Sequence, residues 1–181
     1  MFFFIFFCSQ NIFASMYFEP VAGYGKGTSD LNTAKANTYI SPSVGFKFGY
    51  FVRYVYLVGD IRYSVLNITE ESSDSSPGVT SYGIGVGWDW NIPIRTFIGF
   101  DLKASTSING NSFSGSGQRI GIGYYLSLNT LLSIEFVSQK MTFETSSSTE
   151  IDFNNSQTLL TFSFPVEFMY PQTSWKDKVR K

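Results

Sequence analysis

The segment Ser81–Trp90 shows the clearest alternation of large and small side chains in the chain. Its even positions, Tyr82 to Trp90, are all large and apolar, whereas its odd positions, Ser81 to Asp89, are glycine, serine or aspartate. Successive side chains of a strand point to opposite faces, so one face is bulky and the other is small or polar. A bulky face that ends in two tryptophans is typical of a transmembrane β-strand, with lipid outside, a narrow lumen inside and aromatic side chains at the membrane boundary.

The same alternation recurs along the chain and predicts eight strands, each about as long as a tilted strand needs to be to cross a bilayer. The predicted strands are Met16–Lys26, Tyr39–Phe51, Tyr54–Ser64, Ser81–Trp90, Ile94–Ser105, Gln118–Leu128, Thr130–Met141 and Gln157–Phe168.

Long and short connections alternate between these strands. The long, polar connections are Gly27–Thr38, Val65–Val79, Thr106–Gly117 and Thr142–Ser156, and the tight turns lie near Val52, Pro93 and Asn129. An up-and-down barrel with both termini at the short-turn side produces this rhythm. The sequence therefore predicts an all-β fold, an eight-stranded antiparallel up-and-down transmembrane β-barrel with short periplasmic turns and four longer extracellular loops.

The domain organisation expected from the sequence is simple, since 181 residues suit one domain. Residues 1–14 form an apolar run ending in Ala14, which predicts a secretory signal peptide; a buried strand is the alternative. Residues 15–170 form the predicted outer-membrane barrel, and residues 171–181 a short basic periplasmic tail.

Composition excludes several classes of function. Aromatic residues make up 18% of the chain and charged residues only 15%, against about 25% charged in an ordinary soluble domain. The net charge of −1 provides no basic field for nucleic acid. The chain has one cysteine, Cys8, and no histidine, so the commonest general base and transition-metal ligand are missing. We expect no catalytic, metal or cofactor site.

Charged side chains share the inward rows with the glycines. The predicted lumen charge network consists of Glu19, Lys47, Asp60, Arg62, Asp89, Arg95, Asp101, Lys103, Arg119, Glu135 and Glu167. The interior of an eight-stranded barrel is just wide enough for side chains, so these charges must neutralise one another. The favoured interpretation is a polar plug, and the alternative is a narrow ion path. An aromatic girdle is predicted from Tyr24, Tyr50, Tyr63, Tyr82, Trp88, Trp90, Tyr124 and Phe168.

The chain resembles the OmpX/OmpA-type eight-stranded outer-membrane barrels. The resemblance lies in Tyr17–Pro20, in the glycine alternation of Tyr82–Trp90 and in the closing segment Leu159–Phe168, and it covers about Met16–Tyr170. The closing segment resembles an assembly signal, which implies recognition by the barrel assembly machinery. The chain departs from the pattern by continuing beyond Phe168, so the machinery would have to recognise an internal phenylalanine.

We therefore expect a monomer in the outer membrane of a Gram-negative-type bacterium, surrounded by outer-membrane lipid and lipopolysaccharide. Its expected role is structural or surface interaction through the extracellular loops, with a surface ligand that the sequence does not name; a porin-like narrow channel is the alternative. Small barrel enzymes that modify lipid A resemble the chain in size but rely on a histidine beside a serine. A soluble lipocalin-like carrier would leave rows of large apolar side chains in water.

Overall fold

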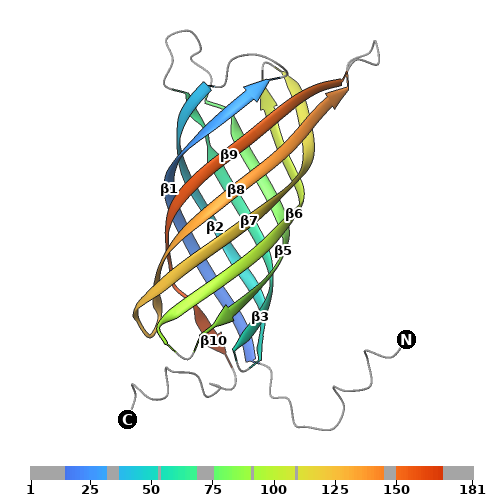
Figure 1. Cartoon of the computed structure of the whole chain (residues 1–181). Coiled ribbons are helices and arrows are strands. Elements are labelled where there is room, and N and C mark those ends of the chain that lie inside the picture. The colour runs from blue at the N-terminus through green and yellow to red at the C-terminus, as the bar shows by residue number, and fades with distance from the viewer. Residues whose placement is uncertain are drawn as a thin grey trace, which may run out of the picture.

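The alternating side chains fold into one closed antiparallel barrel in the computed structural model (Figure 1). The described residues are 15–31, 37–52, 54–68, 76–90, 92–108, 110–144 and 150–168. Their strands are β1 (Ser15–Leu31), β2 (Asn37–Val52), β3 (Val55–Val65), β4 (Asn67–Ile68), β5 (Gly78–Asp89), β6 (Ile94–Ile108), β7 (Asn111–Ser127), β8 (Thr130–Glu144), β9 (Glu150–Ser163) and β10 (Val166–Phe168).

Eight strands form the wall within these described ranges, because β4 continues β3 and β10 continues β9 after short interruptions. β1 pairs with β2 along one edge and with β9 and β10 along the other, which closes the sheet. The predicted all-β, eight-stranded antiparallel up-and-down barrel and the order of its strands are confirmed. The part of the chain that is described contains no helix long and apolar enough to cross a membrane.

The tight turns lie where the sequence predicts them, at the lower end of the barrel in Figure 1. Met16 and Phe168, near the two ends of the described chain, pair with each other at this same end. The predicted signal peptide, the predicted tail and residues 32–36, 69–75 and 145–149 of three predicted long connections lie outside the described residues.

The long connections were predicted too long, because the strands continue well beyond the apolar alternation. β1 and β2 remain paired up to Ser29 and Asn37. Between β6 and β7 only a tight turn remains, with Gly110 at a φ of 81°, a conformation that glycine adopts without a Cβ clash. In these extensions the outward face is polar, so hydrophobic alternation no longer marks the strand although the backbone ladder persists.

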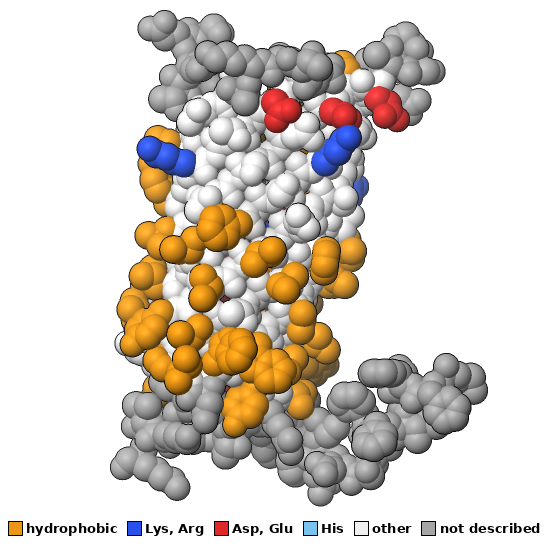
Figure 2. Space-filling view, in the orientation of Figure 1, with side chains coloured by type: hydrophobic (Ala, Val, Ile, Leu, Met, Phe, Trp, Pro, Cys, Tyr) orange, Lys and Arg blue, Asp and Glu red, His pale blue; other side chains and the backbone are white. Residues whose placement is uncertain are grey.

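The lower part of the outer wall is a belt of exposed apolar side chains, and the upper part is polar (Figure 2). On β1 the outward row runs from Met16 through Phe18 to Tyr24 and then changes to Lys26 and Thr28. So large an exposed apolar surface is unfavourable in water and matches the lipid-facing band of a transmembrane barrel.

The eight aromatic residues predicted for a girdle are all on the outer wall, 45–59% exposed. Those near the strand ends at the tight turns are Tyr50, Trp88, Trp90, Tyr124 and Phe168, and those near the upper edge of the apolar belt are Tyr24, Tyr63 and Tyr82.

Candidate functional site

The candidate site is the barrel lumen, because glycines on the inward rows leave room there for large side chains of neighbouring strands. A Cβ atom added at Gly87 would lie 1.8 Å from Cζ of Tyr56, and one added at Gly85 would lie 2.3 Å from Cε2 of Phe97. The aromatic rings of Tyr56 on β3 and Phe97 on β6 therefore fill the space beside the glycines of β5. The lumen is packed at the positions where the inward side chains of β5 are small.

The lower part of the lumen is an aromatic layer. Its buried members form two clusters, with Tyr17, Phe51, Tyr56, Val58 and Phe97 in one and Tyr125 and Leu131 in the other. The Tyr56 ring stacks between those of Tyr17 and Phe97, with centroid separations of 5.4 and 6.2 Å.

Arg95 crosses this layer and is 2% exposed. Its guanidinium donates two parallel hydrogen bonds to Asp89, one of them 2.8 Å long, and a third of 2.8 Å to Glu19. It also donates to the Tyr17 hydroxyl, and its Cζ lies 4.3 Å from the ring centroid of Tyr56 and 5.1 Å from that of Tyr125. Parallel bonds to a carboxylate are among the strongest that a protein makes, so Arg95 is firmly held.

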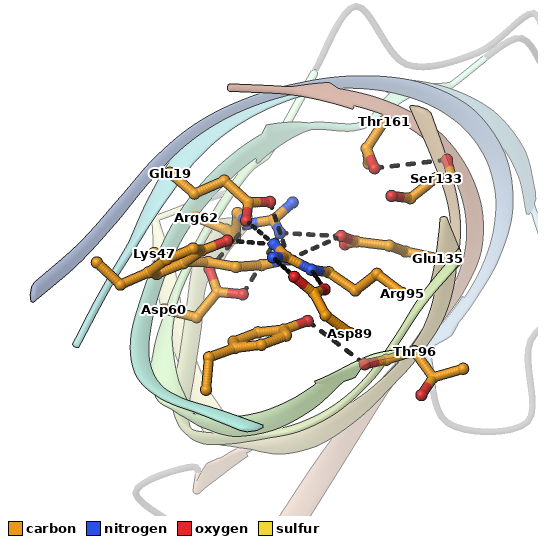
Figure 3. A network of polar contacts seen from close by, with 12 residues as sticks. Glu19, Lys47, Asp60, Arg62, Asp89, Arg95, Thr96, Ser133, Glu135 and Thr161 are labelled. Atoms are coloured by element: carbon orange, nitrogen blue, oxygen red, sulfur yellow. Dashed lines mark hydrogen bonds and ion pairs between the residues drawn. The ribbon is translucent and has the colours of Figure 1, made fainter. Parts of the chain in front are cut away.

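Above Arg95 the ion pairs extend across the lumen (Figure 3). Arg62 donates to Asp60 at 2.8 Å and to Glu135 at 3.2 Å. The Lys47 ammonium lies 3.3 Å from Glu135 and 3.6 Å from Glu19, which joins this group to that of Arg95. Side chains from β1, β2, β3, β6 and β8 thus meet in the middle of the barrel.

A further group of ion pairs surrounds Arg119. Its guanidinium donates to both oxygens of Asp101, at 2.8 and 3.1 Å, and to the Ser81 hydroxyl. The Gln139 amide also donates to Asp101, at 2.6 Å, and accepts from Asn155 at 2.8 Å. This chain of hydrogen bonds leads towards the upper end of the lumen.

A cluster of buried apolar side chains, here called the cap, lies at that upper end, and the sequence does not predict it. It consists of Tyr39, Leu66, Val79, Ala104, Phe113, Met141 and Phe153, with Ile108, Phe143 and Ile151 packed against them. Phe113 and Phe153 lie in segments predicted as polar loops, and β7 and β9 turn both inward. Isolated large apolar residues in these serine-rich segments were the signal that could have revealed the cap.

Nine of the eleven predicted lumen charges are buried, each 4% exposed or less. These nine are Glu19, Lys47, Asp60, Arg62, Asp89, Arg95, Asp101, Arg119 and Glu135. Each has at least one oppositely charged partner within 4.0 Å. In the described residues, buried carboxylates thus outnumber buried cations by one.

The other two predicted members, Lys103 and Glu167, are not fully buried. Lys103 was predicted wrongly, since its side chain is on the outer wall. The registers of β6 with β5 and with β7 shift there, so that Leu102 and Lys103 are both exposed before Ala104 turns inward. Such a β-bulge places two residues opposite one and reverses the alternation. Glu167 is half-buried on β10, at the lower end.

No metal centre is found among the described residues, since no three His, Cys, Asp or Glu side chains are grouped as a metal ion would require. Each buried carboxylate is engaged by arginine or lysine instead.

Comparisons with known proteins support the architecture. No protein-family model matches the chain, and a search of curated proteins finds no match. Among solved structures, Neisserial surface protein A (NspA) is similar with a TM-score of 0.59 and 15% identity, over 84% of this chain and 98% of that chain. Ail, the attachment invasion locus protein of Yersinia pestis, has a TM-score of 0.55 and 12% identity, over 82% and 98%. The chain therefore has the fold of the small eight-stranded outer-membrane β-barrels, as its resemblance to the OmpX/OmpA type implied.

Proposed function

We propose that this protein is a closed, non-conducting barrel of the bacterial outer membrane, with a structural or surface-interaction role above the membrane. The observation that carries the proposal is the filling of the lumen: an aromatic layer, a network of ion pairs and an apolar cap follow one another along the barrel. The fold and the apolar belt support the placement in the outer membrane.

The packing favours a plug over an ion path. Charges that line a channel face water, whereas Arg62, Arg95 and Glu135 are each 2% exposed and paired. An apolar constriction is itself a barrier to ions, and Tyr39 and Met141 of the cap are fully buried. Catalysis is also disfavoured, because the buried acids are held by arginine and lysine and the chain has no histidine.

Wild-type protein in a planar bilayer is expected to show no conductance steps, because ions would have to cross all three layers. Phe113→Ser, which weakens only the cap, should also stay closed, since the ion-pair network remains below it. Current is recorded across the bilayer, with an open porin as the positive control for reconstitution. Steady conductance steps in the wild type, with an ion selectivity that changes in Arg119→Ala, would contradict the plug and support the channel.

The orientation of the barrel is tested by single cysteines at its two ends. Ser112 is exposed on β7 near the upper end, and Ile92 is 53% exposed at a lower turn. On intact cells, Ser112→Cys should react with a membrane-impermeant maleimide, and Ile92→Cys should react only after lysis. Wild-type protein controls for labelling of Cys8. The reverse pattern would show that the barrel is inserted upside down.

A further inference from the structure

Three exposed lysines lie on the outer wall close above the apolar belt. Lys26 follows Tyr24 on the outward row of β1, Lys103 follows Leu102 at the bulge of β6, and Lys140 is exposed on β8. Figure 2 shows basic side chains in the upper, mainly polar part of the wall, with acidic side chains beside and above them. Lys26 and Lys103 each follow an exposed apolar residue of the belt on their strand, so they lie where lipid headgroups begin when the belt is in the hydrocarbon.

A shallow hollow of about 320 Å³ lies in the wall beside Lys26. It is lined by Lys26, by four exposed hydroxyl residues, by Gly27 and by the buried Gln157. The hydroxyl residues are Thr28, Thr38, Ser156 and Thr158. No carboxylate is among the described residues that line the hollow.

The strand register builds this hollow from β2, β1 and β9. Lys26 lies opposite Thr158, and Thr28 lies opposite both Ser156 and Thr38. Small side chains on three adjacent strands leave the depression, and the longer Lys26 borders it. The surface is one cation among hydroxyl groups that both donate and accept hydrogen bonds.

Lys140 stands two strands away from Lys26, with β9 between them. It is 63% exposed, and its ammonium lies 2.9 Å from Asp152. The hydrogen bond to Asp152, together with its negative charge, raises the pKa of Lys140 above its ordinary value. Because the charge of Asp152 offsets that of Lys140, this pair adds little to the field beside the hollow, and Lys26 is the cation that a phosphate would meet there.

We propose that this hollow binds the phosphorylated sugar headgroup of an outer-leaflet glycolipid, with Lys26 on a phosphate and the threonine and serine hydroxyls on the sugar. An ammonium and a phosphate form charge-assisted hydrogen bonds, and sugar hydroxyls match a surface of mixed donors and acceptors. The inference rests on the proposed location in the outer membrane, and it adds a defined site to the general contact with lipopolysaccharide.

The test measures binding of a bisphosphorylated diglucosamine lipid to the full chain in detergent micelles, by native mass spectrometry. The same lipid without its phosphates is measured in parallel. Lys26→Gln is expected to weaken binding of the phosphorylated lipid about tenfold, the factor that corresponds to the loss of one charge-assisted hydrogen bond. Binding of the dephosphorylated lipid should already be weak in the wild type and unchanged in the variant.

Lys103→Gln is the matched control, because Lys103 is also exposed above the belt but does not line the hollow. It should change binding by less than about twofold, a small fraction of the effect of one charged hydrogen bond. Thr158→Val, which removes a hydroxyl and keeps the shape, should weaken binding without changing the net charge.

Equal binding of the two lipids would contradict the site, and so would an equal loss of lipid binding in Lys103→Gln and Lys26→Gln. The site would also be contradicted if inorganic phosphate bound as tightly as the lipid, with the same dependence on Lys26. A folded, non-conducting barrel that shows any of these would disprove the headgroup site alone. A conducting wild type would instead disprove the proposed function, whatever lipid it binds.

Discussion

Arg95→Ala is expected to lower the free energy of unfolding by about 3–5 kcal/mol, the range for breaking a buried ion pair by removing one partner. The arginine holds Asp89 and Glu19 and contacts the rings of Tyr56 and Tyr125. Its loss would leave two carboxylates in a space of low dielectric, with Lys47 as the remaining cation beside Glu19.

The measurement is denaturant unfolding of the barrel in micelles, followed by tryptophan fluorescence. Lys103→Ala is the control, because it removes an exposed cation from the same strand, β6, and should change stability by no more than about 1 kcal/mol. Arg95→Lys should fall between the two, since it keeps the charge and loses the parallel bonds to Asp89. A mild effect of Arg95→Ala would mean that these carboxylates are solvated, which contradicts the plug.

Ile84→Arg is expected to cost about 2–4 kcal/mol of folding into a bilayer, as for a cation on the lipid face near the membrane midplane. Ile84 is 56% exposed within the apolar belt and lies opposite Gly59 and Phe100 on the neighbouring strands. The long arginine side chain would have to carry its charge through hydrocarbon to reach the headgroups.

Ser138→Arg is the matched control, because Ser138 is exposed on β8 in the polar part of the wall. It should fold into vesicles like the wild type. The folded fraction is read from the shift in electrophoretic mobility of the unheated protein. Equal folding of Ile84→Arg and Ser138→Arg would mean that the apolar belt does not face lipid.

The strand pattern and the tight turns could be predicted from the sequence, and nine of the eleven charges predicted for the lumen are buried. The physical reason is that a strand has a period of two. Where one face of a strand meets lipid and the other meets the lumen, as in β5, apolar side chains alternate with small or polar ones. A charged residue in the small, polar row is therefore predicted to point into the lumen. In β5 the inward row consists mainly of glycines, and this row of small residues predicts a crowded lumen.

The alternation no longer predicts a strand where both of its faces are polar, and it no longer predicts the inward face where the register shifts. Above the belt the outward face is polar, so the sequence predicts a loop around Ser29 and Asn37, where β1 and β2 in fact continue. At the β6 bulge one extra residue turned Lys103 outward, and no local feature of the sequence marks that slip. Phe113 and Phe153 joined the cap only because β7 and β9 continue that far.

The sequence by itself thus determined the architecture and the inward rows within the apolar belt, since both depend on local periodicity. Only the tertiary structure decided which charges meet. Asp89 is six positions from Arg95 and Glu19 is 76, yet one guanidinium bonds both. That contact depends on the register and closure of the whole barrel, which bring distant inward rows to the same level. The hollow beside Lys26 arose in the same way, because closure places β1 between β2 and β9.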